Sequence, residues 1–421
     1  MRLERLYFDI DRVVFGESSY IKDHTLVIDR QELEKTAGSD LFSGVEINIA
    51  EPGSNARILS IGDTIQPTIR IDDSETTFPG LTGKMYTVGD GRALMLRGVA
   101  VSEVVEMRVD IPSILQFTEE AAEITKLANM WHITMDAYPA PGVTKNDYLT
   151  ALNISSKRLA KHIASLASGL EPDETEAFEL KREVPAGLPR VAYLADVFCH
   201  RPHTESLIYG VSMYESLPTI LHPNEILDGA LINRNYDQSF NANPTYIWQN
   251  HPIILELYKR HGIDLNFVGV VLNNVHHEMA WKERNAVMAS ALLNNVLRAE
   301  AAIITKDGGG HPQVDVGLAI DTLEGRYGIK TVAVLVEMLS HINDSYGQII
   351  FNSDYANAIV STGCTAAVTL PPPKTVIGSL WHDDHMGIGA TDKTGEMRLN
   401  HRVLRGGQSQ LGWSWFSSHK Y

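Results

Sequence analysis

The sequence predicts an α/β protein in which a β-rich N-terminal region precedes a Rossmann-like domain, or domains, built on a parallel sheet. Two observations predict this class. Up to about residue 110, short β-rich segments alternate with turns that contain Gly, Asp and Ser. From residue 190 onward, continuous runs of Val, Ile and Leu alternate with helical segments. Such runs, joined by helical crossovers, are typical of a parallel sheet that is covered on both faces.

The β-rich N-terminal region is expected to span residues 1–185. Its first strands are predicted at RLYFDIDRVVFG, HTLVIDR and GVEINIAEPG, and the glycine-punctuated stretch 78–101 continues the pattern. WHITMDAYPAPG, at 131–142, predicts a strand that runs into a Pro/Gly turn. Apolar residues at helical spacing over 146–170 then predict a helix with a C-terminal Gly-Leu cap. An acidic and then Pro/Gly-rich stretch, 171–189, supplies the boundary.

The α/β domain that holds the predicted site is expected at 186–378. A helix is predicted between two of its strands at 279–301. The predicted strands are 190–198, 229–232, 265–274, 301–310, 330–339 and 358–371. Residues 379–421 do not fit the strand and helix alternation, and we expect them to form a C-terminal arm of a kind that packs on a neighbour.

The composition excludes several classes of partner. The formal net charge is −16, whereas a nucleic-acid partner or an anionic membrane surface would require a basic face. The two cysteines, Cys199 and Cys364, do not form a disulfide framework, which favours a reducing compartment. The N-terminus lacks the basic and apolar pattern of a secretory signal, and no apolar run reaches 18 residues. We therefore expect a cytoplasmic protein.

Four polar loops follow predicted strands, at 232–246, 273–283, 307–315 and 337–344. Open α/β sheets bind ligands outside the carboxyl ends of their strands. The first loop, INRNYDQSFNANPTY, has no Cys or His, and its only carboxylate is Asp237. Its amide groups are suited to holding a carbonyl or carboxylate. They belong to Asn233, Asn235, Gln238, Asn241 and Asn243.

The loop NNVHHEMAWKE brings two imidazoles and a carboxylate together at His276, His277 and Glu278. Adjacent histidines usually point apart, so one of them, His277, is the candidate ligand or general base. The alternative is that both histidines cap the following helix or lie on the surface.

The loop DGGGHPQVD is neither a Walker motif nor a GxGxxG motif. Three consecutive glycines let backbone N–H groups approach a small ligand closely, which makes Gly309 and Gly310 candidate substrate-binding residues. His311 is the candidate catalytic imidazole, and Asp315, four residues later, is expected to orient it. The alternative is a flexible strand-to-helix turn.

Three other features give weaker signals. His382 and His385 in WHDDHMG have the spacing of a cation site if that segment is helical, and the alternative is a solvated polar tail. Cys199 precedes His200 and could be a thiolate, although a buried, inert cysteine is the more common case. His222 is expected in a turn. The chain has no GxSxG elbow.

Several stretches, in a fixed order over most of residues 1–378, resemble one family. They include PTILHPNEILDGALI and NPTYIWQNHPII. The full set lies at 78–101, 171–180, 218–232, 243–254, 257–274, 282–284, 328–337 and 370–378. Together they resemble the pyruvoyl-forming subunit of component B of the glycine, sarcosine and betaine reductases.

The resemblance implies a specific chemistry at the Asn-rich loop. The family precursor is cut at an Asn-Cys pair just before Asn-Pro-Thr-Tyr, and the new chain then starts with a pyruvoyl group. That carbonyl forms a Schiff base with the amino substrate in glycine-type enzymes, and a selenoprotein partner subunit attacks the carbon so that the C–N bond is reductively cleaved. The implied partner of this chain is a component-B γ-like subunit.

The sequence departs from the family at this pair, where it has Asn235 and Tyr236. A tyrosine cannot start the acyl shift, because its hydroxyl is not on Cβ. Ser239 is the only residue of the loop that could substitute chemically. We therefore expect a chain that stays uncut, without a pyruvoyl group, in which polar side chains or a divalent metal activate the substrate.

The predicted site combines the loops. Catalytic roles are assigned to His277, His311 and Asp315, and a metal is assigned to His276, His277 and His311. Substrate-binding roles are assigned to Asn235, Tyr236, Ser239, Asn243, Gly309 and Gly310.

Three functions remain open. The first is the large subunit of a two-component enzyme that acts on a C–N or related bond of a small nitrogenous substrate, by reductive, hydrolytic or lyase chemistry. The second is a non-catalytic scaffold or regulatory subunit that completes a partner subunit's active site. The third is a stand-alone substrate-binding module.

Overall fold

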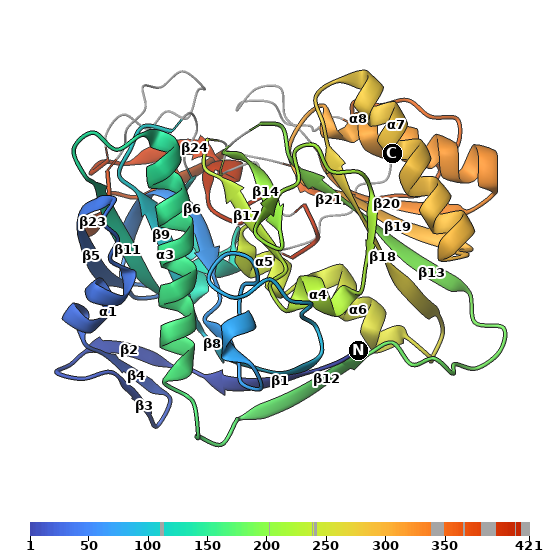
Figure 1. Cartoon of the computed structure of the whole chain (residues 1–421). Coiled ribbons are helices and arrows are strands. Elements are labelled where there is room, and N and C mark those ends of the chain that lie inside the picture. Colours follow the sequence, from blue (N-terminus) through green and yellow to red (C-terminus); the bar gives the residue numbers. More distant parts are fainter. Residues whose placement is uncertain are drawn as a thin grey trace.

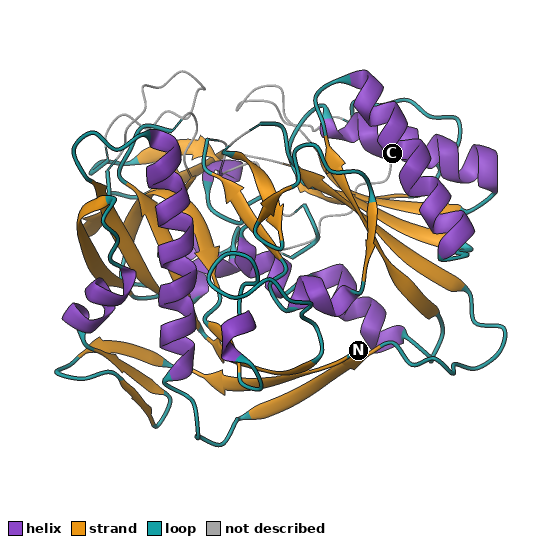
Figure 2. Cartoon of the chain, in the orientation of Figure 1, coloured by secondary structure: helices purple, strands orange, loops and turns teal. Residues whose placement is uncertain are grey.

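The computed structural model is a mixed α/β structure, as predicted (Figure 1). It describes residues 1–109, 113–201, 203–237, 239, 242–337, 349–364, 367–379, 393–408 and 410–413. Figure 2 shows that strands dominate the N-terminal part, whereas helices gather beside the C-terminal sheet. Among the described residues, we find no helix that is both long and apolar enough to cross a membrane.

In the described part of the N-terminal region, the strands form two large sheets and one small sheet, and one C-terminal strand, β23, joins a large sheet. A four-stranded sheet has the order β12-β1-β8-β7, and a six-stranded assembly runs β10-β6-β9-β11-β5 with β23 added beside β6. Their bounds are β1 (Arg2–Asp9), β5 (Phe42–Ala50), β6 (Ala56–Ile65), β7 (Thr68–Arg70), β8 (Gly91–Arg97), β9 (Val99–Val105), β10 (Ser113–Gln116), β11 (Trp131–Pro139), β12 (Glu174–Glu179) and β23 (Thr375–Ile377). The small sheet contains β2 (Arg12–Phe15), β3 (Tyr20–Lys22) and β4 (Thr25–Ile28).

One long helix, α3 (Lys145–Ser165), lies across this region and confirms the helix predicted at 146–170 (Figure 1). Thr144 caps it by accepting a hydrogen bond from the backbone N–H of Asp147. Its apolar side packs beside α1 (Arg30–Ala37). The buried side also carries Asn153 and Lys157, which contribute polar groups to the interior.

The C-terminal sheet has the order β16-β18-β13-β19-β20-β21, and every neighbouring pair except β16 with β18 is parallel. Its bounds are β13 (Arg190–Phe198), β16 (Thr219–Leu221), β18 (Asn266–Val275), β19 (Ala301–Lys306), β20 (Lys330–Glu337) and β21 (Ile359–Cys364). The parallel sheet is therefore confirmed for five predicted strands. The sixth, at 229–232, is wrong: β17 (Leu231–Asn235) instead pairs with β14 (Thr204–Ile208), in a separate antiparallel sheet with β15 (Val211–Ser212).

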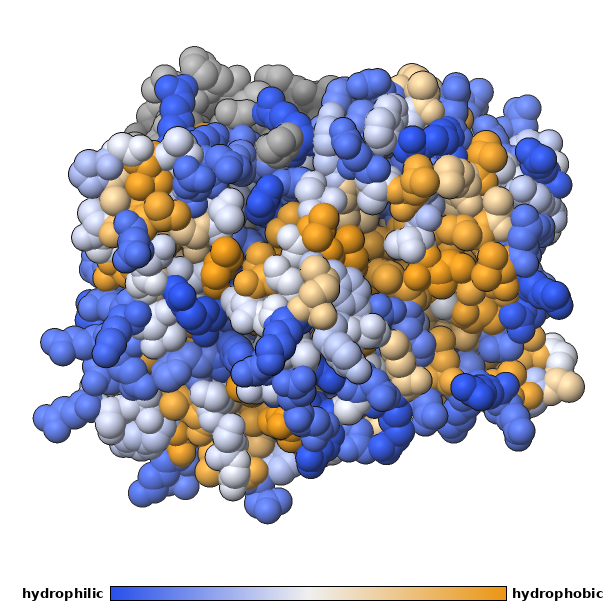
Figure 3. All heavy atoms as spheres, in the orientation of Figure 1, coloured by the Kyte–Doolittle hydropathy of each residue, from blue (hydrophilic) through white to orange (hydrophobic). Residues whose placement is uncertain are grey.

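Helices cover the two faces of this parallel sheet unequally. α7 (Met279–Ala291) and α8 (Pro312–Ile320) pack together on one face (Figure 1). The opposite face receives α6 (Pro252–Arg260) over β18. Farther along that face, Val332 and Val360 are 36% and 40% exposed, and Figure 3 shows apolar side chains gathered over the sheet. Within the described residues, the predicted cover on both faces is thus only partial.

Short elements connect these layers. They are η1 (Ser74–Thr76), α2 (Glu119–Ala122), η2 (Lys126–Asn129), α4 (Pro223–Leu227), α5 (Thr245–Gln249) and η6 (His401–Val403). Two π-helical segments, η4 (Leu292–Val296) and η5 (Asp321–Arg326), follow α7 and α8.

The described part of the C-terminal segment folds back on the chain itself. β24 (Met397–Asn400) pairs with β22 (Ala367–Leu370), and the backbone N–H of Arg405 donates to the carbonyl of Ile114 at 2.8 Å. One hydrophobic cluster contains Ile58, Tyr193 and Leu404, so the N-terminal, central and C-terminal parts share a core. The boundaries at 185 and 378 stay predictions.

Candidate functional site

The strand order of the parallel sheet places one group of loops at its centre. The chain passes from β13 to β18 on one side and then to β19 on the other side of β13. Ligands of open α/β sheets bind outside the carboxyl ends of the strands, at the point where the order reverses. Here that point lies between the ends of β13 and β19, which lead into His200 and into the predicted loop 307–315.

Four imidazoles meet at this edge. His200 stacks on His311 with ring centroids 4.7 Å apart, and its ring lies 6.1 Å from that of His277. His277 in turn stacks on His276 at 4.6 Å. The structure therefore brings the three predicted histidines together. It adds His200 to this group. The sequence signal for His200 was its position directly after the strand β13 and Cys199.

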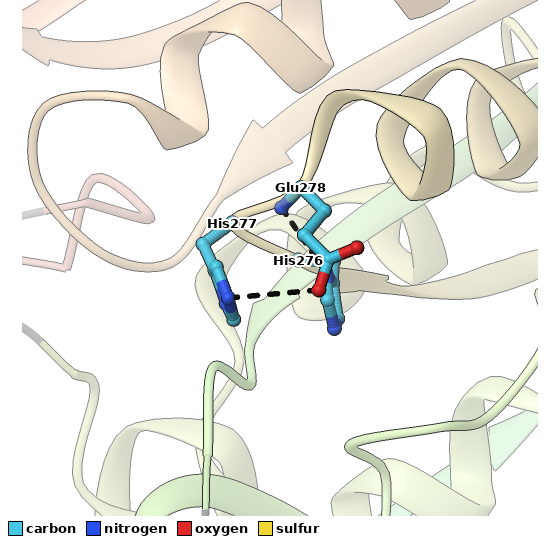
Figure 4. Close-up of side chains that lie close together, drawn as sticks. All are labelled: His276, His277 and Glu278. Carbon is cyan, nitrogen blue, oxygen red and sulfur yellow. Dashed lines mark hydrogen bonds and ion pairs between the residues drawn. The ribbon is translucent and has the colours of Figure 1, made fainter.

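His276, His277 and Glu278 form a group that could hold a metal ion (Figure 4). One ligand atom from each lies within 4.8 Å of the others. His276 is buried and its Nε2 has no hydrogen-bond partner, whereas His277 and Glu278 are exposed. The group shares two residues with the predicted metal set and has Glu278 in place of His311. The N-cap of α7 is Glu278, so neither histidine occupies that position.

Burial keeps several of these rings neutral. It lowers the pKa of His200 to about 3, and electrostatic interaction with the His311 ring lowers it further. Burial, followed by the charge of Lys282, lowers the pKa of His311 to about 4. Burial also lowers the pKa of His276. A neutral imidazole has a free lone pair, so these rings can act as metal ligands or as bases near pH 7.

Asp315, which was predicted to orient His311, instead forms a buried ion pair with Lys282. The pair joins α8 to α7, and both side chains are 2% exposed. Burial raises the pKa of Asp315 to about 6, although the charge of Lys282 opposes this shift. Asp315 therefore links α8 to α7, and its Oδ1 has no hydrogen-bond partner.

A second buried carboxyl group, Asp196, lies on β13 and was missed by sequence reasoning. Its Oδ1 accepts a hydrogen bond from Nδ2 of Asn273 at 2.7 Å, and its Oδ2 has no partner. Burial, together with the negative charge of Asp315, raises the pKa of Asp196 to about 8. The available signal was a carboxylate inside the apolar run AYLADVF.

Hydrogen bonds and packing hold Asn235 and Tyr236 of the Asn-rich loop in place. Tyr236 is fully buried, and its hydroxyl accepts a hydrogen bond from Nδ2 of Asn153 at 3.0 Å. Its ring lies against Gly62, where an added Cβ would be 2.5 Å from the ring atom Cε1. The Nδ2 of Asn235 donates to Oδ1 of Asn233 at 2.9 Å, and the Oδ1 of Asn235 has no partner.

A fully buried ionic network lies beneath this loop. Nζ of Lys157 is 2.8 Å from Asp63 and 2.9 Å from Glu103, and Arg405 approaches Asp63 at 3.4 Å. Asp63 also accepts the backbone N–H of Thr245 at 2.9 Å. Burial lowers the pKa of Lys157, but the two carboxylates raise it more, so the net shift is upward.

The two predicted substrate loops are directly joined. The backbone N–H and the Nδ2 of Asn243 both donate to Oδ1 of Asp307, at 2.8 and 2.9 Å. Ser239 is held by Ser113, whose backbone N–H donates to its Oγ at 2.7 Å, and its carbonyl accepts a hydrogen bond from Arg405. The polar groups of the loops thus form a connected site between the N-terminal and the parallel sheets.

The other residues named from the sequence lie in different environments. Gly309 and Gly310 are half-buried, and Gly310 has a positive φ of 72°. Burial raises the pKa of the Cys199 thiol, which excludes a thiolate at neutral pH. His222 caps α4 within a capping box. His382, His385, Gln238, Asn241 and most of the loop 337–344 lie outside the described residues.

Comparison with known proteins identifies the family. The family model of the glycine/sarcosine/betaine reductase component B subunits matches residues 1–419. This chain belongs to that family.

The relatives match along most or all of their length. The chain is 28% identical to the glycine reductase complex component B subunits alpha and beta of Acetoanaerobium sticklandii, with all of both chains covered. It is 30% identical to the betaine reductase complex component B subunit alpha of Peptoclostridium acidaminophilum, with 98% of each chain covered. The corresponding sarcosine reductase subunit of that organism is 31% identical over 75% of each chain. No solved structure matches.

Proposed function

We propose that this chain is the large subunit of a two-component enzyme of the reductase component B type, and that it acts on a C–N or related bond of a small nitrogenous substrate without a pyruvoyl group. The observation that supports the proposal is Tyr236, which is fully buried and which the resemblance matches to the cleavage cysteine of the family precursor. Membership of the component B family supports the reductase-like role.

The residues present do not fit a pyruvoyl group. The acyl shift that starts cleavage needs a thiol or hydroxyl on Cβ, next to the preceding carbonyl. The hydroxyl of Tyr236 lies instead at the far end of the ring, where it meets Asn153. Ser239 follows three residues later, and its hydroxyl is engaged with Ser113. The proposed chemistry therefore does not use a pyruvoyl group.

Substrate binding is assigned to the joined loops. The Nδ2 of Asn233 and the Oδ1 of Asn235 are buried without hydrogen-bond partners, so they can pair with polar atoms of a substrate. The half-buried Gly309 and Gly310 offer backbone N–H groups on the neighbouring loop. His311 directly follows these glycines and is assigned as the general base.

His276, His277 and Glu278 would hold a divalent cation, because imidazole nitrogen and carboxylate oxygen are common ligands of zinc. The chemistry that such a cation supplies is Lewis-acid polarisation of a carbonyl or activation of water. His277 is exposed, so it can reach a ligand at the mouth of the site.

Metal analysis and two histidine variants test this proposal on the complex co-purified with the γ-like partner. We expect His276→Ala to lower zinc affinity by at least about tenfold, and His311→Ala to lower turnover by about 10²–10⁴-fold. The matched control is His162→Ala. This change removes a half-buried histidine that is hydrogen-bonded to Glu32 at the other end of the molecule. Unchanged turnover in His311→Ala would remove that residue from the mechanism. Full activity after changes in both loops would favour the scaffold role instead.

A further inference from the structure

Among the residues that the structure describes, three lysines are buried, and one of them differs from the other two. Lys157 and Lys282, which are 0% and 2% exposed at the side chain, each form an ion pair with buried carboxylates. Lys306 is 1% exposed, yet no ion pair to a carboxylate is present within the described residues. Its Nζ donates one hydrogen bond, to the carbonyl of Gly308. A buried ammonium without a counter-ion is unfavourable, so the charged form of this amine is destabilised.

Lys306 also occupies the centre of the site. It is the last residue of β19, and in the parallel register it lies beside Asp196 of β13, where the strand order reverses. The glycine that accepts its hydrogen bond begins the run of three glycines at 308–310, of which the last two are half-buried. The ring of Phe198 packs against Gly308, where an added Cβ would lie 2.1 Å from the ring atom Cδ2.

The environment of Lys306 increases the neutral fraction of its amine. Burial lowers the pKa of Lys306 to about 8, although the negative charge of Asp307 opposes this shift. Only a neutral amine has the lone pair that attacks a carbon atom. Asp307 itself is fully buried, burial raises its pKa to about 7, and its Oδ2 has no hydrogen-bond partner. A carboxyl group with these properties can exchange a proton during the reaction.

We propose that Nζ of Lys306 is a covalent nucleophile that forms a Schiff base with the aldehyde or ketone carbonyl of a small substrate. The lone pair of Nζ forms a bond to the carbonyl carbon, and the carbon–oxygen π bond breaks to give a carbinolamine. The amine proton passes to the oxygen, and Asp307 is the group placed to carry it. Loss of one water gives the iminium, and addition of one water returns the free lysine, so no oxidant or reductant is required.

This inference deepens the proposed function by naming a substrate class. An iminium carbon withdraws electrons from the carbon beside it, so a C–N bond on that neighbouring carbon becomes easier to break. The reaction that follows the adduct rests on the proposed function, whereas formation of the adduct itself does not. In the resembled family the protein supplies the carbonyl, whereas here the protein supplies the amine.

Reductive trapping tests the proposal. The full chain, alone and in complex with its partner, is incubated with glyoxylate and cyanoborohydride at pH 7, and adducts are mapped by peptide mass spectrometry. We expect Lys306 to be modified at least tenfold faster than the exposed Lys22 and Lys259. The ion-paired Lys157 serves as the buried control and is expected to stay unmodified. Lys306→Met should lose the fast adduct and keep its circular dichroism spectrum.

The outcomes separate the two proposals. Modification of Lys306 no faster than of Lys22, in both the chain and the complex, would overturn the inference and leave the proposed function standing. A chain found cut at the Asn-rich loop, but with rapid trapping at Lys306, would overturn the absence of the pyruvoyl group and leave the nucleophile standing.

Discussion

Replacing Lys157 with methionine is expected to lower the free energy of unfolding by about 3–5 kcal/mol. Lys157 is the shared cation of Asp63 and Glu103, and all three side chains are fully buried. Removing it leaves carboxylates in an interior where their desolvation is no longer compensated. Arg405 reaches Asp63 at 3.4 Å and offsets only part of the loss. Denaturant titration followed by circular dichroism measures the effect.

Two further variants make this test specific. Lys22→Met, which removes an exposed lysine from a short strand, should change the free energy of unfolding by less than about 0.5 kcal/mol. Adding Asp63→Asn and Glu103→Gln to Lys157→Met should recover part of the stability, because the uncompensated charges are then absent. A loss below about 1 kcal/mol in Lys157→Met would show that the network does not support the loop as described.

Replacing Asp196 with asparagine is expected to stabilise the protein at high pH. Burial raises the pKa of Asp196 to about 8, whereas an unfolded aspartate has a pKa near 3.9. The folded protein therefore holds a proton that the unfolded chain releases, so this group's contribution to stability falls as the pH rises from about 4 to 8. Between pH 5 and pH 9, the wild type should lose on the order of 4 kcal/mol that Asp196→Asn does not lose.

Thermal unfolding of both proteins at pH 5 and pH 9 measures this difference. Asp307 and Asp136 have raised pKa values as well, and their contributions cancel because both proteins contain them. The matched control is Asp264→Asn, because the exposed pair with Arg260 lowers the pKa of Asp264 and gives no gain at pH 9. Equal pH dependence in wild type and Asp196→Asn would contradict a neutral Asp196 in the fold.

The parallel sheet was predictable because its strands are buried on most positions, so their sequences are continuous apolar runs. β13 and β20 illustrate this pattern, and both strands fall where it predicts them. The short run before the Asn-rich loop has the same composition, but β17 pairs with β14 in a separate antiparallel sheet. Pairing partners depend on tertiary contacts that the local pattern does not contain.

The candidate site was predictable only where residues of one chemical type follow a strand. His276, His277 and His311 are of this kind, and they do come together. Lys157 and Lys306 gave no such signal, because a lysine in a helix or at a strand end is usually solvated. Arg405 lies more than 300 residues from Asp63, and the fold alone brings these two side chains together.

The central claim is that this member of the component B family works uncut, with Tyr236 intact and no carbonyl group on the protein. The intact mass of the chain, co-expressed with its γ-like partner and measured under denaturing conditions, tests it most directly. We predict a single species of 46.6 kDa. Two fragments that meet at Asn235–Tyr236 or at Ser239, the second blocked at its N-terminus by a carbonyl group, would contradict the account.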